Sequence, residues 1–315
     1  MNTPALAAGI DLGGTKMAVA FVNRAGRILA RQTLPTEASL GFPRAVDRLS
    51  RALEQLLARS NTPASALAGI GIGCAGPVDP ARGRIHNPYT LDGWADCDIV
   101  TPLQARFKLP VFLENDADAA ALGEYVAGAG QGRNPVVILT LGTGVGGGVI
   151  GNGQIYRGVN GEHPELGHIA VAPDGPACYC GGAGCLESLA SGTALAAAGK
   201  AFGWMDARAV FAAAAAGHSA AQALVRRAVE AVATGAWTIC HTFLPQCIVL
   251  GGGMMDEHFD LFAAAVHDRL RTATQFNRQA VVVARAALGN DAGVVGAAAL
   301  AFLHAGGLVS QSETI

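Results

Sequence analysis

Short apolar runs closed by glycine alternate along this chain with amphipathic stretches that have the spacing of a helix. Residues 6–12, 17–23 and 27–34 are apolar runs separated by the turns GGTK and RAG. Tight glycine turns between short apolar runs are typical of β-hairpins. Residues 43–60 then carry apolar side chains at helical spacing with charges between them. The opening of the chain is therefore predicted to be three antiparallel strands followed by a helix.

The same plan recurs in the second part of the chain. DLGGTK and LGTGVGG each join two apolar runs, an internal echo that predicts two related α/β lobes with a cleft between them. We place the first lobe at 1–117, with a final helix at about 292–306 packing back on it, and a larger second lobe at 118–291. The other expected elements are strands at 67–73, 110–114, 135–150 (two strands and a turn), 247–252 and 280–286, and helices near 99–107, 117–128 and 220–243.

Composition narrows the class of protein. The 315 residues suffice for two domains, and a formal net charge of −2 offers no electrostatic footprint for nucleic acid or an anionic membrane. The opening MNTPALAAGID lacks the features of a signal peptide, and seven cysteines, an odd number, suit a reducing compartment. Two long uncharged stretches, 135–156 and 231–255, are interrupted by glycine, histidine or proline and do not read as membrane spans. A cytoplasmic protein without nucleic-acid or membrane partners is expected.

A glycine-rich loop at 161–187 concentrates metal-binding side chains. Cys178, Cys180 and Cys185 follow His168 closely, and three thiolates with an imidazole form a set that zinc prefers in tetrahedral geometry. The alternatives are three inert buried cysteines, or a disulfide, which would be strained between Cys178 and Cys180. Four protein ligands leave no open position, so the predicted zinc is structural.

Two glycine turns are candidates for phosphate binding. They are 11–16 (DLGGTK) and 142–144 (GTG), where the absence of Cβ atoms lets backbone amides approach phosphate oxygens. Neither has the spacing of a P-loop or of a dinucleotide-binding turn, and each alone could be an ordinary β-turn. Together, and with Asp11 available to orient Mg²⁺, they favour a nucleotide. The third cluster, 251–253, could pass near an adenosine or could be a plain strand-to-helix turn.

Asp116 is the candidate general base, because it follows a strand and precedes a helix, where its carboxylate can project into a cleft. A phosphoryl acceptor hydroxyl needs such a carboxylate to orient it and take its proton. The alternative is helix capping, which Asn115 and Asp118 could perform equally well. Glu165, His168 and Glu187 are polar residues around the zinc loop. The carboxylates of Glu165 and Glu187 could accept from sugar hydroxyls, or the two glutamates could be solvated loop and first-turn helix residues.

These motifs, in this order, resemble the ROK family (repressors, uncharacterised frames and kinases) of bacterial sugar kinases over nearly the whole chain. The family fold is the actin-like ATPase fold, with two RNase H-like lobes and the active site between them. The matching segments are GIDLGGTK (9–16), GCAGPVD (73–79), ENDADAAALGE (114–124), LTLGTGVGGG (139–148), ELGH (165–168), CYCGGAGCLE (178–187), IVLGGG (248–253) and GNDAGVVGAA (289–298).

The resemblance implies ATP-dependent phosphorylation of a hexose, usually on the C6 hydroxyl, with Asp116 as the base. It implies a structural Zn²⁺ on His168, Cys178, Cys180 and Cys185. The implied sugar contacts are Gly76, Asn115, Asp116, Glu165, His168 and Glu187. The implied contacts of ATP and Mg²⁺ are Asp11, Gly13, Gly14, Thr15, Lys16, Gly142, Thr143, Gly144, Gly251 and Gly252. Family members are often homodimers or homotetramers.

The sugar is less sharply indicated than the chemistry. The loop at 173–195 and the segment LTLGTGVGGG (139–148) look most like glucokinase members, which makes glucose the first expectation. His163-Pro164 is similar to fructokinase-type members, and N-acetylhexosamine kinases share the cysteine loop. Fructokinase or mannokinase and N-acetylhexosamine kinase therefore stay open as alternatives. The sugar-sensing repressor branch carries an added DNA-binding module, whereas here the first expected strand lies within about ten residues of Met1, and no basic patch takes its place.

Overall fold

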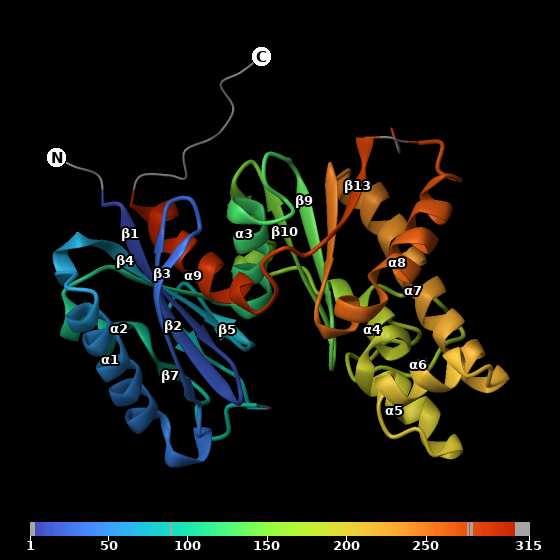
Figure 1. Cartoon of the computed structure of the whole chain (residues 1–315), viewed down its shortest axis with the longest axis horizontal. Helices are drawn as coiled ribbons and strands as arrows, with labels where there is room; N and C mark the ends of the chain where they lie inside the picture. The colour runs from blue at the N-terminus through green and yellow to red at the C-terminus, as the bar shows by residue number, and fades with distance from the viewer. Residues whose placement is uncertain (1–3, 89, 276, 278–279, 306–315) are drawn as a thin grey trace. The chain divides into compact units, whose positions relative to one another are not determined.

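The structure is a computed structural model that describes residues 4–88, 90–275, 277 and 280–305. The chain forms two compact units (Figure 1). Unit 1 lies within 1–132, 153–163 and 287–315, and unit 2 within 133–152 and 164–286. Each unit has its own sheet and its own apolar core, so each is described by itself.

Unit 1 contains a five-stranded sheet in the order β3-β2-β1-β4-β8. The first three strands are antiparallel and the last three, β1, β4 and β8, are parallel. The strands are β1 (Leu6–Leu12), β2 (Lys16–Asn23), β3 (Ile28–Pro35), β4 (Leu67–Cys74) and β8 (Val111–Asn115). The hairpins and the two later strands expected from the apolar pattern are all present.

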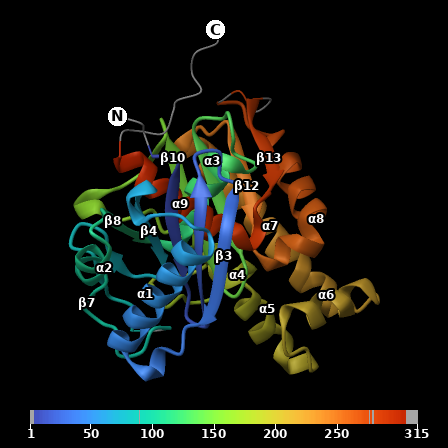
Figure 2. The ribbon, with the colours of Figure 1, turned by 60° about the vertical axis from the view of Figure 1, so that its left-hand side comes forward.

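Helices cover both faces of this sheet, because successive side chains of a strand point to opposite faces. Ile10 and Leu12 belong to a core shared with α1 (Phe42–Arg59) and α2 (Val100–Phe107), and α1 runs across the sheet in Figures 1 and 2. The opposite face packs on α9 (Ala292–His304), which in turn packs on α3 (Asp116–Ala127). The contact between β1 and α9 needs glycine, since a Cβ at Gly9 would lie 2.0 Å from the carbonyl oxygen of Val294.

Unit 2 repeats the sheet plan, with strands in the order β10-β9-β12-β13. β9 and β10 are antiparallel, and β9, β12 and β13 are parallel. The strands are β9 (Val136–Leu141), β10 (Val145–Gly151), β12 (Cys247–Gly251) and β13 (Val282–Arg285). The helices are α4 (Leu186–Ala190), α5 (Gly192–Gly199), α6 (Ala207–Ala215), α7 (Ser219–Phe243) and α8 (Gly253–Leu270). The predicted α/β class with two related sheets is confirmed.

Some features differ from the apolar pattern. Three short strands were not predicted: β5 (Val78–Asp79) pairs with β6 (Arg84–Ile85), which pairs in turn with β7 (Cys97–Asp98). Strands of two residues are too short to leave a periodic signal. A further two-residue strand, β11 (Gln154–Ile155), follows β10.

The division into units also differs from the expected boundary after residue 117. Residues 118–132 group with unit 1, because α3 makes its main packing contact with α9. A short 3-10 helix, η4 (Leu166–His168), leads into the cysteine loop of unit 2. Within the part of the chain that the structure describes, no helix has the length and apolarity needed for a membrane span.

Candidate active site

The parallel strands of unit 1 bring two carboxylates to one edge of the sheet. Leu12 of β1, Cys74 of β4 and Asn115 of β8 are in register at the carboxyl ends of their strands. Asp11 precedes the first of these residues and Asp116 follows the last. Burial raises the pKa of the Cys74 thiol, and the negative charges of Asp116 and Asp11 raise it further. The charges of both aspartates therefore reach the buried Cys74 thiol.

Asp116 has the environment of a general base. Burial raises its pKa to about 6, and the neighbouring charge of Asp11 also raises it, whereas the backbone amide of Ala117 and the nearby His163 lower it. The amide of Ala117 donates to Asp116 Oδ1 at 2.9 Å. A carboxyl group with a pKa near 6 is ionised at neutral pH, and it accepts a proton more readily than an exposed aspartate does.

Helix capping, the alternative role for Asp116, is performed by its neighbour. The side chain of Asn115 accepts from the amide of Ala117 at 2.8 Å and from that of Asp118 at 3.4 Å. Asn115 also contacts Gly76, where a Cβ would lie 2.5 Å from Asn115 Nδ2. The structure thus brings together three of the predicted sugar-site residues, Gly76, Asn115 and Asp116.

The first glycine turn is held by an uncharged side chain. Its Gly13 amide donates to the carbonyl of Lys16 at 3.0 Å. The fully buried Thr36 donates its hydroxyl to the Gly13 carbonyl at 2.6 Å and its amide to the Thr15 carbonyl at 2.9 Å. These bonds fix the carbonyls of the turn from the side of β3.

Asp11 lies between this turn and the first residues of α9. A Cβ at Gly293 would come within 2.9 Å of the Asp11 carboxyl carbon, so glycine is needed there. Burial raises the pKa of Asp11, and the charges of Lys16 and Arg31 lower it. A helix N-terminus favours a nearby negative charge. The carboxylate is therefore available as an oxygen ligand for Mg²⁺.

The second glycine turn, in unit 2, is held by a carboxylate. Glu187 Oε2 accepts from the amide of Val145 at 2.8 Å, and a Cβ at Gly144 would lie 2.6 Å from the same oxygen. The amide of Gly192 donates to the Gly142 carbonyl at 2.7 Å, and that of Thr193 to the Thr143 carbonyl at 3.1 Å. Glu187 therefore lies in the first turn of α4, as its alternative role predicted, and its carboxylate also contacts the second glycine turn.

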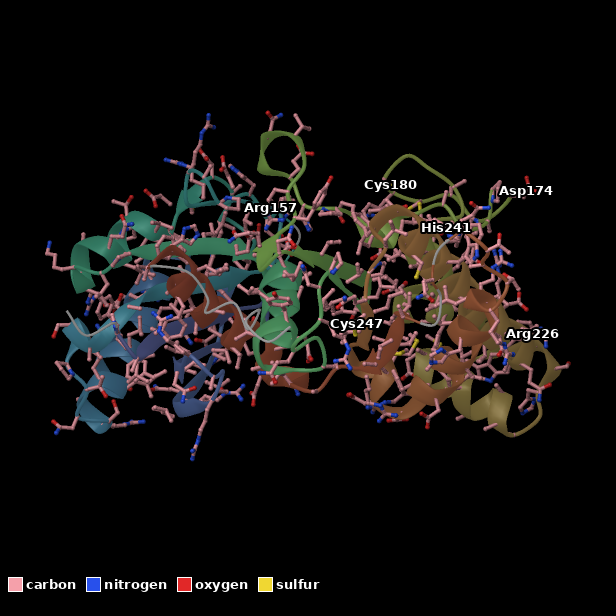
Figure 3. The ribbon with its side chains drawn as sticks, turned by 90° about the horizontal axis from the view of Figure 1, so that it is seen from above. Arg157, Asp174, Cys180, Arg226, His241 and Cys247 are labelled. Atoms are coloured by element: carbon pink, nitrogen blue, oxygen red, sulfur yellow. The ribbon has the colours of Figure 1, made fainter. Side chains whose placement is uncertain are left out.

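The four predicted zinc ligands lie together in unit 2. Their ligand atoms are all within 4.8 Å of one another. His168 Nδ1 is 3.5 Å from Cys178 Sγ, and Cys180 Sγ is 3.6 Å from Cys185 Sγ. A tetrahedral site with Zn–S bonds of about 2.3 Å separates two sulfurs by about 3.8 Å, so this spacing fits zinc and is too long for a disulfide. All seven cysteines are free thiols, and Cys180, labelled in Figure 3, is the exposed ligand.

The loop acquires this geometry from local backbone features. The amide of Cys178 donates to the Gly182 carbonyl at 2.8 Å, and Gly181 has a φ of 93°, in the left-handed region that favours glycine. His168 comes from the end of η4, where its amide donates to the carbonyl of Glu165 at 2.9 Å. Glu165 itself is exposed and belongs to the same unit.

Tyr179 is a residue that sequence reasoning missed. Its ring packs edge-on against His168, with centroids 5.1 Å apart. Although 83% of the residue is exposed, partial burial of its hydroxyl raises the pKa of that group, and the neighbouring carboxylates of Glu187 and Glu165 raise it further. Its place between two ligand cysteines was visible in the sequence, but its partner was not. Tyr179 therefore links the cysteine loop to the carboxylate that holds the second glycine turn.

The third glycine cluster has a packing explanation of its own. Gly252 lies between β12 and α8 with a φ of 87°, and a Cβ there would come within 2.4 Å of the Leu141 carbonyl oxygen. A Cβ at Gly251 would lie 2.9 Å from the Cβ of Ala286. Contact of these glycines with an adenosine stays a prediction.

A second group that the sequence did not reveal is a buried ion-pair network beside Asp116. It joins Arg157 to Glu114 and Asp118. The pairing residues are 39 or more positions apart in the chain. Charged residues without a motif around them give no signal of such pairing.

Comparison with known proteins identifies relatives of this chain. The pattern of the ROK family matches residues 7–303. A glucokinase of Halalkalibacterium halodurans is 34% identical, over 97% of this chain and 95% of its own. An N-acetylmannosamine kinase of Citrobacter koseri is 37% identical, over 93% of this chain and 97% of its own.

A solved structure of a ROK family member is similar to this chain in both sequence and fold. The ROK family glucokinase of Streptomyces griseus, in complex with glucose and AMPPNP, superposes with a TM-score of 0.73 and 33% identity, covering 94% of this chain and 98% of its own. The sequence resemblance is thereby confirmed, and so is the actin-like ATPase fold. This chain belongs to the ROK family.

Proposed function

We propose that this protein is an ATP-dependent hexose kinase that phosphorylates the C6 hydroxyl of glucose. The observation that carries the proposal is the position of Asp116, a carboxyl group with a pKa raised to about 6 at the carboxyl end of β8, in the electrostatic neighbourhood of Asp11. The glucokinase relatives and the Streptomyces griseus structure with glucose and an ATP analogue support the choice of sugar and phosphate donor.

In this proposal Asp116 orients the sugar hydroxyl and accepts its proton as the bond to phosphorus forms. Such general-base assistance contributes about 10²–10⁴ in rate. Asn115 and Gly76, which contact each other beside Asp116, contribute an amide and a backbone group to neighbouring hydroxyls.

The nucleotide would be held by the two glycine turns. Gly13, Gly14, Thr15 and Lys16 belong to the first turn, and Gly142, Thr143 and Gly144 to the second; Gly251 and Gly252 would lie beside the adenosine. Asp11 would hold Mg²⁺, which when bound neutralises charge on the phosphates during transfer.

In unit 2, His168, Cys178, Cys180 and Cys185 would hold a structural Zn²⁺, whose donor set and spacing they fit. The metal would keep the loop between Glu165 and Glu187 rigid, so that the two carboxylates accept from sugar hydroxyls in a fixed arrangement. His168, with one ring nitrogen on the metal, would donate the N–H of the other ring nitrogen. The hydrogen bond between Glu187 and the Val145 amide supports a role for Glu187 at the second glycine turn as well.

Phosphorylation of N-acetylmannosamine is the second candidate function. It is favoured by the Citrobacter koseri relative, which is slightly more similar in sequence than the glucokinase of Halalkalibacterium halodurans. Fructose and mannose stay possible acceptors because His163-Pro164 is similar to fructokinase-type members.

The test is ADP formation by the purified protein with ATP, Mg²⁺ and each of glucose, mannose, fructose, N-acetylmannosamine and N-acetylglucosamine. We expect the highest kcat/KM with glucose. A higher value with N-acetylmannosamine would favour the second candidate, and no turnover with any of these sugars would overturn the kinase proposal.

A further inference from the structure

Two carboxylates flank the proposed catalytic junction in the interior of unit 1. Glu114 is the residue before Asn115 and is 7% exposed, and Asp118 lies in the first turn of α3 and is fully buried. Isolated buried carboxylates are strongly unfavourable unless a counter-charge and hydrogen bonds compensate them. Burial accordingly raises the pKa of Asp118 to about 6.

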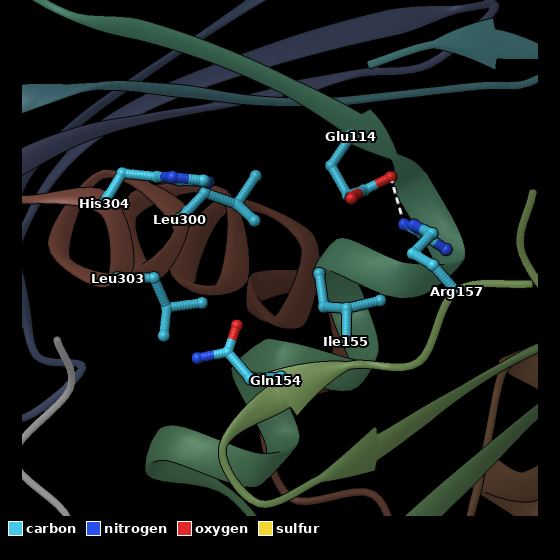
Figure 4. A pocket seen from close by; sticks show the side chains of 7 residues that line it. All are labelled: Glu114, Gln154, Ile155, Arg157, Leu300, Leu303 and His304. Carbon is cyan, nitrogen blue, oxygen red and sulfur yellow. Dashed lines mark ion pairs between the residues drawn. The ribbon is translucent and has the colours of Figure 1, made fainter. Parts of the chain in front are cut away.

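A single guanidinium pairs with both carboxylates, and His163 Nδ1 also lies 3.4 Å from Asp118 Oδ2. Arg157 Nη2 forms an ion pair with Glu114 Oε1, drawn as a dashed line in Figure 4, and Arg157 Nη1 donates to Asp118 Oδ2 at 2.7 Å. The side chain of Arg157 is itself only 21% exposed. A planar guanidinium offers several donors in fixed directions, which lets one arginine bridge two carboxylates as a lysine cannot.

The two partners of Arg157 also hold the junction between β8 and α3. Glu114 Oε1 accepts from the backbone amide of Asn115 at 2.8 Å. The amide of Asp118 donates to the Asn115 side chain that caps the helix. Arg157 therefore joins one group on each side of Asn115 and Asp116, and its charge is used within the protein rather than toward a ligand.

We propose that Arg157 is a positioning residue that sets the orientation of Asn115 and Asp116 by bridging Glu114 and Asp118. The proposal rests on the proposed function, in which Asp116 is the base. A displacement of about 1 Å at a reacting group can change a rate by about 10²-fold, so loss of the bridge should act on turnover rather than on binding of ATP.

A pocket beside the bridge provides a matched control. It has a volume of about 190 Å³ and is lined by Glu114, Gln154, Ile155, Arg157, Leu300, Leu303 and His304 (Figure 4). Gln154 lines the same pocket from the exposed strand β11, three positions before Arg157. Its truncation changes the pocket without removing either ion pair.

The experiment compares Arg157→Gln, Arg157→Lys and Gln154→Ala with the wild type. Measured quantities are kcat, KM for sugar and for ATP, the pH profile of kcat/KM, and the melting temperature. We expect Arg157→Gln to lower kcat by about 10- to 100-fold with KM for ATP within about 2-fold, in line with displacement of a reacting group. Arg157→Lys should recover part of the loss, and Gln154→Ala should match the wild type.

Some outcomes would overturn the inference. A folded Arg157→Gln with kcat within about 2-fold of wild type removes the positioning role, and so does an equal loss in Gln154→Ala. If Arg157→Gln does not fold at the assay temperature, Asp118→Asn is measured instead. It keeps the shape of the side chain and weakens one arm of the bridge, so an unchanged kcat there also rejects the proposal. A wild type that phosphorylates no hexose overturns the proposed function itself, whereas an active wild type with an equally active Arg157→Gln overturns the inference alone.

Discussion

The two glycine turns have the same place in their sheets and different supports. The first is held by the hydroxyl and amide of Thr36, which carry no charge. The second is held by the carboxylate of Glu187, which follows the predicted ligand Cys185 by two residues. Glu187 also raises the pKa of Tyr179, which lies between two other predicted ligands. The second turn is therefore coupled to the cysteine loop within unit 2, whereas the first depends on β3 in unit 1.

This difference suggests that the two units have different roles, which experiments can test. Unit 1 places the proposed base on the ends of buried strands, where hydrogen bonds between strands define its position. Unit 2 places its polar groups on loops, which need another constraint, and a bound metal would provide it. Changes at the proposed base in unit 1 should thus alter turnover, and changes in the cysteine loop of unit 2 should alter sugar binding and metal content.

The largest effect is expected for Asp116→Asn. The amide cannot accept the proton of the sugar hydroxyl, so kcat should fall by about 10²–10⁴-fold. Sugar affinity and zinc content should stay close to wild type, because the cysteine loop belongs to unit 2. Steady-state kinetics, sugar titration and metal analysis measure the three quantities, and an unchanged kcat would remove Asp116 from its proposed role.

Cys180→Ser tests the cysteine loop. Loss of one thiolate should release the zinc, whose binding in small structural sites is worth about 10–16 kcal/mol linked to folding. We expect lower metal content, a lower melting temperature and weaker sugar binding. Wild-type protein without zinc after expression in zinc-supplemented medium would contradict the assignment of these four residues to a metal site.

The pH dependence of kcat/KM tests the state of the base. Asp116 must be deprotonated to act and its pKa is raised to about 6, so kcat/KM should fall about 10-fold per pH unit below pH 6. The charge of His163 lowers that pKa and the charge of Asp11 raises it. His163→Gln should therefore move the acid limb to higher pH, and a limb unmoved in that variant would mean that another group titrates.

Thr36→Val tests the support of the first turn. The valine keeps the shape but removes the hydroxyl that donates to the half-buried Gly13 carbonyl, a bond worth about 1–1.4 kcal/mol. We expect KM for ATP to rise by about 5- to 10-fold, with zinc content unchanged. A rise in KM for sugar and not for ATP would show that this turn does not serve the nucleotide.

The smallest effect is expected for Tyr179→Phe, which removes the hydroxyl beside Glu187 and keeps the ring against His168. One hydrogen bond from that hydroxyl would be worth about 1 kcal/mol, or about a 5-fold rise in KM for sugar. Zinc content should be unchanged. If KM values for sugar and ATP both match the wild type, the link between the cysteine loop and the second turn has no functional weight.

The features that could be predicted from the sequence alone are those formed by residues close together along the chain. Alternating apolar runs and glycine turns predicted the hairpins, and the spacing of Cys178, Cys180 and Cys185 after His168 predicted the metal-binding loop. The position of Asp116 after an apolar strand predicted its place at a sheet edge. Local spacing is sufficient in these cases because strand pairing through a short turn, and ligation from one loop, involve residues close in sequence.

The long-range contacts of these side chains could be known only from the tertiary structure. Glu187 meets Val145 from 42 positions away, Asp118 meets Arg157 from 39, and Asp11 lies against Gly293 at the other end of the chain. It also decided that Asn115, rather than Asp116, caps α3, which leaves Asp116 as the candidate base. The physical reason is that a charged side chain can pair with any opposite charge that folding brings within a few ångströms, and that distance depends on how all the intervening elements pack.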